Sequence, residues 1–486
     1  MTVAGLDVGT TGCKIVLFDK SAAQVASFYE EYPAHHADGL HEINFEDVAK
    51  GVLTVLKKAV AEYPIAALGV TSFGESFVML DEKDQPLAPA MLYTDPRGEE
   101  ECRELVEKVG LQRLTLTCGV RPHSMYSLPK IMWCKRHRPE LFDKCKRILL
   151  GEDYVVYLLS GAAQINYALA ARTGAFDIEK KCWMEEAFSA AEIDPALLSR
   201  PVAPGAVAGV LRPELKEQLG IKEDITIVSG FHDQVAGMVG AGVFTSEQAM
   251  DGTGTVECIP VVLEQKPADP AFYEGGYSVV PYLEGKYACY AFSFTGGASI
   301  KWYRDTFFEN TPEFYGKMDA HLPEGPTGIF VLPHFAGAAT PYMDTAARAA
   351  FVGLGLEHDK YDLYKAIMEG TSYEMRLNFT TLSRHIPRPL ELRATGGGAG
   401  SDAWLQIKAD ILDTPITALT CNEVGAAATA ALAGCAVGFY KDLRDTLSKM
   451  VTERKVFYPD AARTAEYTVL YRKYEGLYQA VKEFRI

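Results

Sequence analysis

The sequence lacks the common motifs of phosphate, dinucleotide and zinc chemistry. Its 486 residues contain no G-x-x-x-x-G-K-[ST] loop, no G-x-G-x-x-G opening a helix and no H-E-x-x-H pair. These absences exclude the P-loop, Rossmann and zinc-peptidase classes. Positive charge is also scarce, because 48 Lys and Arg residues stand against 64 Asp and Glu, for a formal net charge of −16. That balance excludes a nucleic acid or an anionic membrane held by general electrostatics, but not a nucleotide held by local glycine turns and Mg²⁺.

Paired cysteines and long apolar runs are missing too. The ten cysteines form no C-x-x-C pair and show no regular spacing, and no stretch approaches the ~18 apolar residues of a membrane helix. The chain enters a strand pattern by Val3, with no basic and apolar leader before it. We therefore expect thiols rather than disulfides, and a cytoplasmic protein.

What is present is the composition of a globular protein with room for two cores. Apolar residues make up 48% and charged residues 23% of the chain, whose length exceeds one ordinary core. The predicted elements are strands at 3–6, 13–18, 23–32, 66–71, 77–80 and 225–229, helices at 45–63 (capped by Asn44) and 233–243, a mostly helical stretch at 97–200, strands at 248–262, 275–280, 286–294 and 390–395, and helices at 297–308, 360–383 and 403–412. The restart of strands near residue 245 predicts two α/β domains, 1–245 and 246–486.

A glycine-rich turn between two strands occurs once in each predicted half. The turns contain Gly9, Thr10, Thr11 and Lys14 in the first half, and Gly252, Thr253 and Gly254 in the second. Glycine lets the backbone approach a ligand, and successive N–H groups form a concave anion site. Either turn alone is equally typical of an ordinary hairpin. Together they predict two related halves that close on one polyphosphate.

The segment Gly230–Gln234 is the sharpest candidate for catalysis. Asp233 follows a buried strand and opens a helix, where its carboxylate can take a proton from a substrate hydroxyl. Gln234 can hydrogen-bond a neighbouring hydroxyl. The alternative for Asp233 is a helix cap, and His232 is more typical of packing or of support behind the site.

Further segments suit a nucleotide and a polar substrate. The run Gly396–Gly400 before a helix offers a surface without side chains for a base or ribose, and the helix start at Gly297 is similar but weaker. Glu75 can accept two hydroxyl hydrogen bonds from a polyol. Asp95 and Arg97 are as consistent with an internal ion pair as with substrate contact.

At these residues the chain resembles the FGGY family of carbohydrate kinases, over nearly its whole length. The matching segments, in the family's order and spacing, are Asp7–Lys14, Gly230–Gln234, Gly252–Gly254, Gly297–Trp302, Pro341–Asp344 with Arg348, Gly396–Asp410 and Gly425–Ala431. The resemblance implies an α/β fold of two ribonuclease-H-like domains of the actin and hexokinase ATPase type, with the active site in the interdomain cleft. It assigns sugar binding and the catalytic base to 1–245 and nucleotide binding to 246–486.

The resemblance also implies roles for single residues. Asp233 stands at the position of the catalytic base, and Asp7 and Asp233 are the residues expected at Mg²⁺. The expected substrate contacts are Gly74, Glu75, Asp95 and Gln234. The expected ATP contacts are Gly9, Thr10, Thr11, Lys14, Gly252, Thr253, Gly254, Gly297, Lys301, Gly397, Gly398, Ala399 and Asp402. Lys14 stands where glycerol kinases carry Arg, and Asp402 where they carry Asn.

The pattern departs from known subgroups at the substrate positions. Glu75 and Gln234 match glycerol kinases, but the neighbouring Arg of that group is Gly74 here. Xylulose kinases carry Met-His in place of Gly74-Glu75 and Asn in place of Gln234. The loss of an Arg side chain at position 74 predicts room for a longer sugar, which favours a ketose such as xylulose. Glycerol, another polyol or gluconate are the alternatives within the family.

The predicted activity is phosphorylation of a sugar or polyol hydroxyl by Mg·ATP. Asp233 removes the hydroxyl proton, and the oxygen attacks the γ-phosphorus in line. The expected substrate is a small sugar or polyol. A homodimer is the assembly that we consider. The alternatives of a different class are an actin-type ATPase without a sugar site and a non-catalytic sugar-binding regulator.

Overall fold

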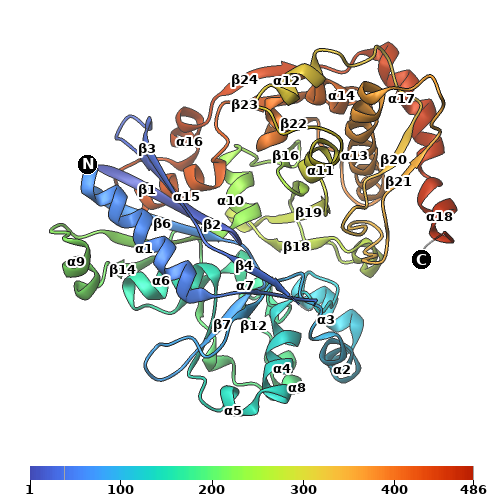
Figure 1. The fold of residues 1–486 in the computed structure, drawn as a ribbon. Coiled ribbons are helices and arrows are strands. Elements are labelled where there is room, and N and C mark those ends of the chain that lie inside the picture. Colours follow the sequence, from blue (N-terminus) through green and yellow to red (C-terminus); the bar gives the residue numbers. More distant parts are fainter. Residues whose placement is uncertain (38, 485–486) are drawn as a thin grey trace. The chain divides into compact units, whose positions relative to one another are not determined.

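The computed structural model describes residues 1–37 and 39–484, and the chain divides into two structural units (Figure 1). Unit 1 comprises Met1–Gly242, Val279–Tyr287 and Glu423–Val451, and the remaining residues form unit 2. The segments 279–287 and 423–451 come from the half of the sequence that we assigned to the second domain. The units therefore are not the two contiguous ranges 1–245 and 246–486, although the first change of unit, after Gly242, lies close to residue 245.

Unit 1 is built on a six-stranded sheet in the order β14-β15-β6-β1-β2-β3. These strands are β1 (Thr2–Val8), β2 (Gly12–Phe18), β3 (Gln24–Glu31), β6 (Ile65–Ser72), β14 (Val207–Val210) and β15 (Thr226–His232). β1, β6 and β15 run parallel to one another, whereas β2, β3 and β14 pair antiparallel with their neighbours. The carboxyl ends of three adjacent strands thus meet at one edge of the sheet.

Helices cover both faces of this sheet. On one face, α1 (Phe45–Glu62) packs Val48, Val52 and Leu56 against alternate residues of β1 and β2, and Asn44 caps its start by accepting a hydrogen bond from the backbone N–H of Glu46. On the other face, α15 (Val424–Ala436) lies so close to β1 that a Cβ on Gly5 would stand 1.8 Å from the carbonyl oxygen of Ala426. Glycine at position 5 is therefore required by backbone contact.

The remaining elements of unit 1 are shorter. The helices are α2 (Glu99–Val109), α3 (Leu111–Cys118), α4 (Ser127–His137), α5 (Pro139–Phe142), α6 (Gly151–Ser160), α7 (Tyr167–Ala171), α8 (Glu185–Ala191), α9 (Pro213–Leu219), α10 (Asp233–Gly240) and α16 (Leu443–Met450). The strands are β4 (Ala34–Ala37), β5 (Leu40–Ile43), β7 (Phe77–Leu80), β8 (Ala90–Met91), β9 (Arg147–Leu150), β10 (Gln164–Asn166), β11 (Phe176–Asp177), β12 (Cys182–Trp183) and β13 (Arg200–Val202).

The sheet of unit 2 repeats the pairing pattern of unit 1. Its neighbouring strands run β19-β17-β16-β22-β23-β24, with β16, β22 and β23 parallel, and β17 and β24 antiparallel to their neighbours. The strands are β16 (Gln248–Thr253), β17 (Glu257–Leu263), β19 (Tyr287–Ser293), β20 (Phe330–Leu332), β21 (Ala350–Val352), β22 (Glu391–Thr395), β23 (Ile416–Leu419) and β24 (Glu453–Phe457), whereas all of β18 (Ser278–Pro281) but its first residue belongs to unit 1. The shared order supports the repeat that the two glycine turns predicted.

Helices of unit 2 enclose an aromatic core beside this sheet. They are α11 (Gly297–Phe307), α12 (Phe314–Asp319), α13 (Lys360–Leu382), α14 (Asp402–Leu412), α17 (Ala461–Tyr474) and α18 (Leu477–Lys482). Tyr364, Tyr373, Tyr467 and Tyr474 are almost fully buried among them. All ten cysteines are present as thiols, as expected. Within the described residues, no helix has both the length and the apolar character needed to cross a bilayer.

Candidate active site

Three carboxylates lie where the parallel strands of unit 1 end. In the register of the sheet, Asp7 of β1 is opposite Thr71 of β6, and His232 at the end of β15 is opposite Ser72. Asp233 follows His232 directly, and Glu75 comes three residues after β6 ends. The sheet therefore brings together Asp7, Glu75 and Asp233 from widely separated parts of the sequence.

Asp233 has the properties of a general base. It is the first residue of α10, whose cap position is His232, and its Oδ1 has no hydrogen-bond partner among the described residues. One third of its side-chain surface is open to solvent, so a substrate hydroxyl can reach it. The pKa of Asp233 is raised to about 7, first by loss of water around the carboxylate and then by the like charges of Asp7 and Glu75. A carboxylate with a pKa near neutrality is well matched to proton removal.

His232 supports this carboxylate as a neutral ring. Its Nε2 lies 3.1 Å from Asp233 Oδ1, without the alignment of a hydrogen bond. Burial and the nearby Arg172 cation hold the pKa of His232 well below its usual value. The ring therefore adds bulk beside Asp233 but no positive charge.

Glu75 is held by Arg172, a residue that the sequence analysis did not single out. Arg172 follows α7, and its Nε donates to Glu75 Oε1 at 2.6 Å while its Nη2 donates to the same oxygen. Both side chains are more than nine-tenths buried. Glu75 has a φ of +63°, a conformation that is rare for a residue with a side chain. Such strain often accompanies a functional site.

The room expected beside Gly74 is absent, so that expectation is wrong. A Cβ at position 74 would lie 2.9 Å from His232 Nε2 and 3.2 Å from Arg172 Cγ. The two side chains cover the glycine. No sequence motif links Arg172 to Gly74, because they are almost a hundred residues apart and meet only through the fold.

Two neighbours complete the surroundings of Asp233. Gln234 is the second residue of α10 and is half-buried. Burial raises the pKa of Tyr93, and the negative charges of Glu75 and Asp233 raise it further. Tyr93 was quoted in the sequence only as part of a polar segment, without a role.

Asp95 forms the internal ion pair that the sequence left open as an alternative. Its carboxylate accepts hydrogen bonds from Arg97 Nε at 2.7 Å and Nη2 at 2.8 Å, and from the backbone N–H of His41 at 2.9 Å. Arg97 also pairs with Glu42. Because these bonds engage both Asp95 oxygens, we do not carry Asp95 forward as a substrate ligand.

The first glycine turn joins β1 to β2. The backbone N–H of Gly9 donates to the carbonyl of Gly12 at 2.9 Å, and Thr10 and Thr11 lie at the surface of the turn. The Lys14 ammonium pairs with Glu423. The pKa of Asp7 is raised to about 6 by burial and by Glu423, and Lys14 opposes this rise. The turn thus combines two hydroxyls, one cation and a half-buried carboxylate.

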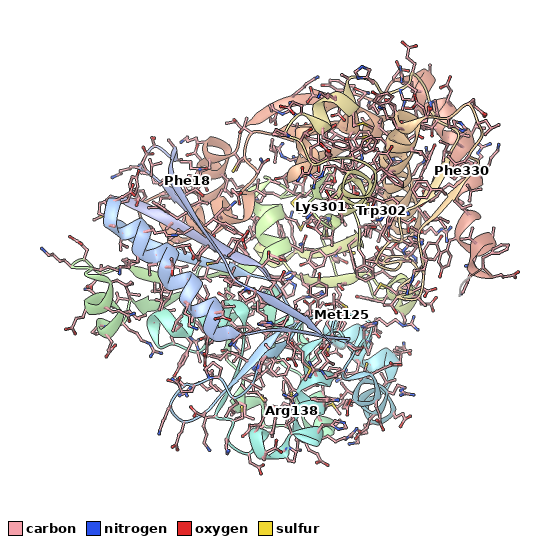
Figure 2. All side chains as sticks on the ribbon, in the orientation of Figure 1. Phe18, Met125, Arg138, Lys301, Trp302 and Phe330 are labelled. Atoms are coloured by element: carbon pink, nitrogen blue, oxygen red, sulfur yellow. The ribbon has the colours of Figure 1, made fainter. Side chains whose placement is uncertain are left out.

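Unit 2 contains a cavity of about 970 Å³, large enough for a nucleotide. Residues of the second glycine turn, of α11 and of the 397–400 turn line it, and Lys301 and Trp302 lie side by side on α11 (Figure 2). Of the expected ATP contacts, those in the lining are Thr253, Gly254, Gly297, Lys301, Gly397 and Gly398. The lining also includes Trp302 and Trp404, flat side chains on which a base can stack.

Glycines at this cavity serve two different purposes. A Cβ on Gly297 would stand 2.7 Å from the carbonyl of Gly254, and a Cβ on Gly398 would stand 2.5 Å from Thr253 Cγ2. A Cβ on Gly397 would meet no atom within 4 Å. Gly297 and Gly398 thus allow three segments to pack closely, whereas Gly397 presents bare backbone to open space.

A fully buried ionic cluster lies beneath the second turn. Lys408 Nζ lies 2.7 Å from Asp251 Oδ2, 2.7 Å from Glu257 Oε1 and 2.5 Å from the Thr253 hydroxyl oxygen. The Thr253 hydroxyl donates to Asp251 at 2.9 Å. This hydroxyl is therefore bonded inside the protein, and the expected role of Thr253 as a hydroxyl donor is already filled. Lys408 was visible in the sequence only as one helix residue.

The other expected ATP contacts are outside the lining of the cavity: Gly9, Thr10, Thr11 and Lys14 in unit 1, and Gly252, Ala399 and Asp402 in unit 2. Ala399 is buried. The Asp402 carboxylate pairs with Arg454 at 2.7 Å and Lys455 at 2.8 Å. The backbone N–H of Gly297 donates to Gly254, so this amide of the helix start is used internally.

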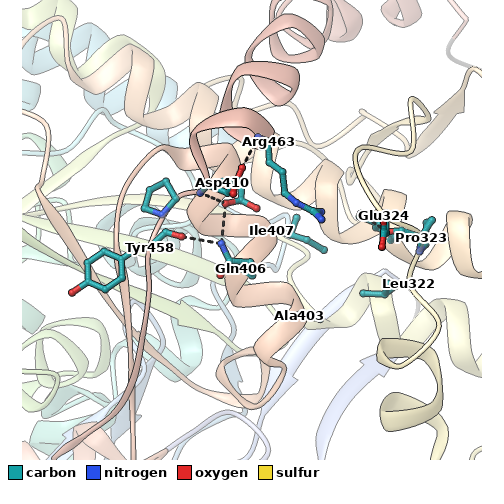
Figure 3. A pocket seen from close by; sticks show the side chains of 12 residues that line it. Leu322, Pro323, Glu324, Ala403, Gln406, Ile407, Asp410, Tyr458 and Arg463 are labelled. Carbon is teal, nitrogen blue, oxygen red and sulfur yellow. Dashed lines mark hydrogen bonds between the residues drawn. The ribbon is translucent and has the colours of Figure 1, made fainter.

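A second cavity of unit 2, of about 560 Å³, lies beside α14 (Figure 3). Gln406 and Asp410 form its wall, and Asp410 accepts hydrogen bonds from the Gln406 amide at 2.9 Å and from the backbone N–H of Asp460 at 2.8 Å. No motif in the sequence indicates this cavity. Among the described residues, no group of three or more His, Cys, Asp and Glu side chains is arranged to hold a metal ion.

Comparisons with known proteins identify the chain's relatives. The model of the FGGY family of carbohydrate kinases, N-terminal domain, matches residues 2–240, and that of the C-terminal domain matches residues 252–437. A xylulose kinase of Bacillus subtilis is 27% identical across 99% of this chain and 97% of its own length. A gluconokinase of the same organism is 26% identical across 96% and 93%.

The same comparisons extend to solved structures. A xylulose kinase from Lactobacillus acidophilus, described as ligand-bound, has a TM-score of 0.91 and 25% identity, and the match covers 99% of this chain and 98% of that one. The predicted two-domain α/β fold of the actin and hexokinase type is confirmed by this agreement.

Proposed function

The chain belongs to the FGGY family of carbohydrate kinases, and we propose that it transfers the terminal phosphate of ATP to a hydroxyl of a ketose, with xylulose as the first candidate. The observation that carries the proposal is the Asp233 carboxylate, whose Oδ1 is buried without a hydrogen-bond partner, whose remaining surface is open to solvent, and whose pKa is raised to about 7 by burial and by the charges of Asp7 and Glu75.

In the proposed reaction, Asp233 accepts the proton of the substrate hydroxyl. The hydroxyl oxygen forms a bond to the γ-phosphorus as the bond from phosphorus to the β,γ-bridging oxygen breaks, which yields a sugar phosphate and ADP. Base action of this kind contributes on the order of 10²–10⁴-fold in rate. Glu75 accepts hydrogen bonds from neighbouring hydroxyls, Gln234 accepts or donates them, and together they orient the reacting hydroxyl.

ATP fits the cavity of unit 2. Bare backbone at Gly397 and flat side chains at Trp302 and Trp404 suit a nucleoside, and Lys301 supplies positive charge. Kinases of this family use ATP with a divalent metal. We propose that the divalent metal is Mg²⁺, which would offset the negative charge of the phosphates when bound. Asp7 offers the oxygen ligand that Mg²⁺ prefers, and Asp233 and Lys14 lie in the same part of unit 1.

The charges around Asp233 favour a neutral acceptor over an aldonate. Arg172 already shares its charge with Glu75, and Lys14 with Glu423. His232 is neutral, while Asp7 and Asp233 are acidic. A substrate carboxylate here would meet like charge without a cation reserved for it. This argument supports a ketose or polyol rather than gluconate, although a gluconokinase is among the relatives.

The test is ADP release from Mg·ATP across ketopentoses, ketohexoses, polyols, glycerol and gluconate. We expect strong stimulation by one neutral compound, lost in Asp233→Asn and retained in the matched control Asp224→Asn, whose carboxylate is exposed and pairs only with Lys216 among the described residues. Hydrolysis indifferent to every sugar would favour an actin-type ATPase. Saturable sugar binding without ADP formation would favour a non-catalytic regulator.

Two expectations about the whole protein stay predictions. A homodimer is tested by light scattering after size-exclusion chromatography, and a cytoplasmic location by fractionation of cells that produce the protein. Neither outcome alters the chemistry proposed for Asp233.

A further inference from the structure

We propose that Arg172 is a positioning residue that sets the specificity of the sugar site, and that glycine at position 74 is the condition for its placement. The proposal rests on the kinase function above and names how one of its substrate ligands, Glu75, is held. Arg172 acts on the substrate through Glu75, and its positive charge also lowers the pKa of Asp233.

The contact between Arg172 and Glu75 is asymmetric. Both guanidinium donors, Nε and Nη2, bind the same carboxylate oxygen, Oε1. Among the described residues, Glu75 Oε2 has no hydrogen-bond partner. Because the pair is buried and charge-assisted, it fixes the plane of the carboxylate. Oε2 is thereby presented to a substrate hydroxyl in one orientation.

Arg172 is itself held from two sides. Its guanidinium lies 5.2 Å from the centre of the Tyr126 ring, which favours a cation above it. Its backbone N–H donates to Leu169 at the end of α7, whose start is capped by Asn166. The Glu75 backbone is fixed as well, because the Ser127 hydroxyl donates to its carbonyl at 2.6 Å. The strained φ of Glu75 is thus stabilised by contacts on both main chain and side chain.

Glycine at position 74 leaves space for the Arg172 side chain, although the two residues are far apart in the sequence. Its missing Cβ would lie 3.2 Å from Arg172 Cγ and 2.9 Å from His232 Nε2. Any side chain at position 74 would push against both. The guanidinium comes instead from Arg172, directly after α7, and position 74 carries no side chain in the space that Arg172 Cγ and His232 occupy.

The experiment compares Arg172→Gln, Arg172→Lys and Gly74→Ala with the wild type, using xylulose or whichever sugar the panel identifies. We expect Arg172→Gln to raise KM for the sugar about tenfold or more, since small displacements of a positioning group have effects of this size. KM for ATP should change less than about twofold, because the nucleotide cavity lies in unit 2. Arg172→Lys should restore part of the loss, because it keeps the charge but not the two-donor contact.

Gly74→Ala should reproduce the Arg172→Gln effect on KM for the sugar, because its Cβ meets Arg172 Cγ, and it should also lower kcat, because the same Cβ meets His232 Nε2 beside Asp233. In the double variant KM for the sugar should be little higher than in either single one, because both changes act on the contact between Arg172 and Glu75. The control is Arg113→Gln, which removes an exposed pair with Glu186 in the same unit. Sugar binding measured by calorimetry without ATP gives the same comparison independently of turnover.

Unchanged sugar KM in Arg172→Gln, or losses in the double variant that multiply fully, would overturn the proposal. So would an equal rise in KM for sugar and ATP, which indicates general loss of structure. These results differ from failure of the kinase proposal, in which wild-type protein shows no sugar-dependent ADP release. If Arg172→Gln does not fold, the values of KM for the sugar in Arg172→Lys and Gly74→Ala test the proposal instead.

Discussion

Replacing Lys408 with methionine should destabilise unit 2 strongly. The ammonium lies within 2.9 Å of both Asp251 oxygens and 2.7 Å from Glu257, and all three side chains are almost completely buried. Among the described residues, Lys408 is the only cation of this cluster. Its removal leaves the carboxylates of Asp251 and Glu257 without a counter-charge. Breaking a buried ion pair from one side costs about 3–5 kcal/mol in the free energy of unfolding.

Glu257 limits the loss, because its pKa is already raised to about 7 and it can take a proton when Lys408 is gone. For a domain of this size, about 2–4 °C of Tm corresponds to 1 kcal/mol, so we expect a fall of ~6–20 °C in thermal denaturation. The triple variant Lys408→Met, Asp251→Asn, Glu257→Gln removes every charge and should recover most of this fall. A shift below about 2 °C in the single variant would refute the argument that the cluster is a charge-balanced support for Thr253.

Three further outcomes follow from the sites. The value of kcat/KM for the sugar should rise with pH and reach half its plateau near pH 7, because Asp233 must lose its proton to act and its pKa is raised to about 7; a rate independent of pH between about 6 and 8 would speak against this base. Gly398→Ala should lower stability by about 1–3 kcal/mol through contact with Thr253, whereas its neighbour Gly397→Ala should fold as the wild type does, and equal Tm values for the two would contradict the packing argument. Asp402→Ala should change the free energy of unfolding by less than about 1 kcal/mol and leave KM for ATP unaltered, because its exposed carboxylate pairs with Arg454 and Lys455; weaker ATP binding would restore Asp402 as a nucleotide ligand.

Local pattern was sufficient to predict the framework of each unit. The apolar spacing of α1 and its Asn44 cap predicted a helix over 45–63, and the structure has it over Phe45–Glu62. The strand before Asp233 was predicted to end at Ser229 but continues to His232. Its last residues pair with Thr71 and Ser72 of β6, and that pairing is a tertiary contact that no local signal reveals.

Long-range contacts explain what the sequence could not show. Segments 279–287 and 423–451 belong to unit 1 because they pack there, as at Gly5 beneath α15, and nothing in their composition marks this. Arg172 and Lys408 carry no motif, and each is recognised only when the fold brings its carboxylate partners within reach. The sequence shows that Gly74 replaces the Arg of glycerol kinases, but it does not show that Arg172 and His232 cover this glycine.

The central claim is that Asp233 removes the proton of a sugar hydroxyl. A single-turnover measurement on Asp233→Asn tests it most directly, with excess enzyme, labelled ATP and the best neutral sugar from the panel. Asparagine keeps the shape but cannot accept the proton, so the account predicts bound ATP and bound sugar with phosphoryl transfer slowed by on the order of 10²–10⁴-fold. Transfer at the wild-type rate with both ligands bound would contradict the account.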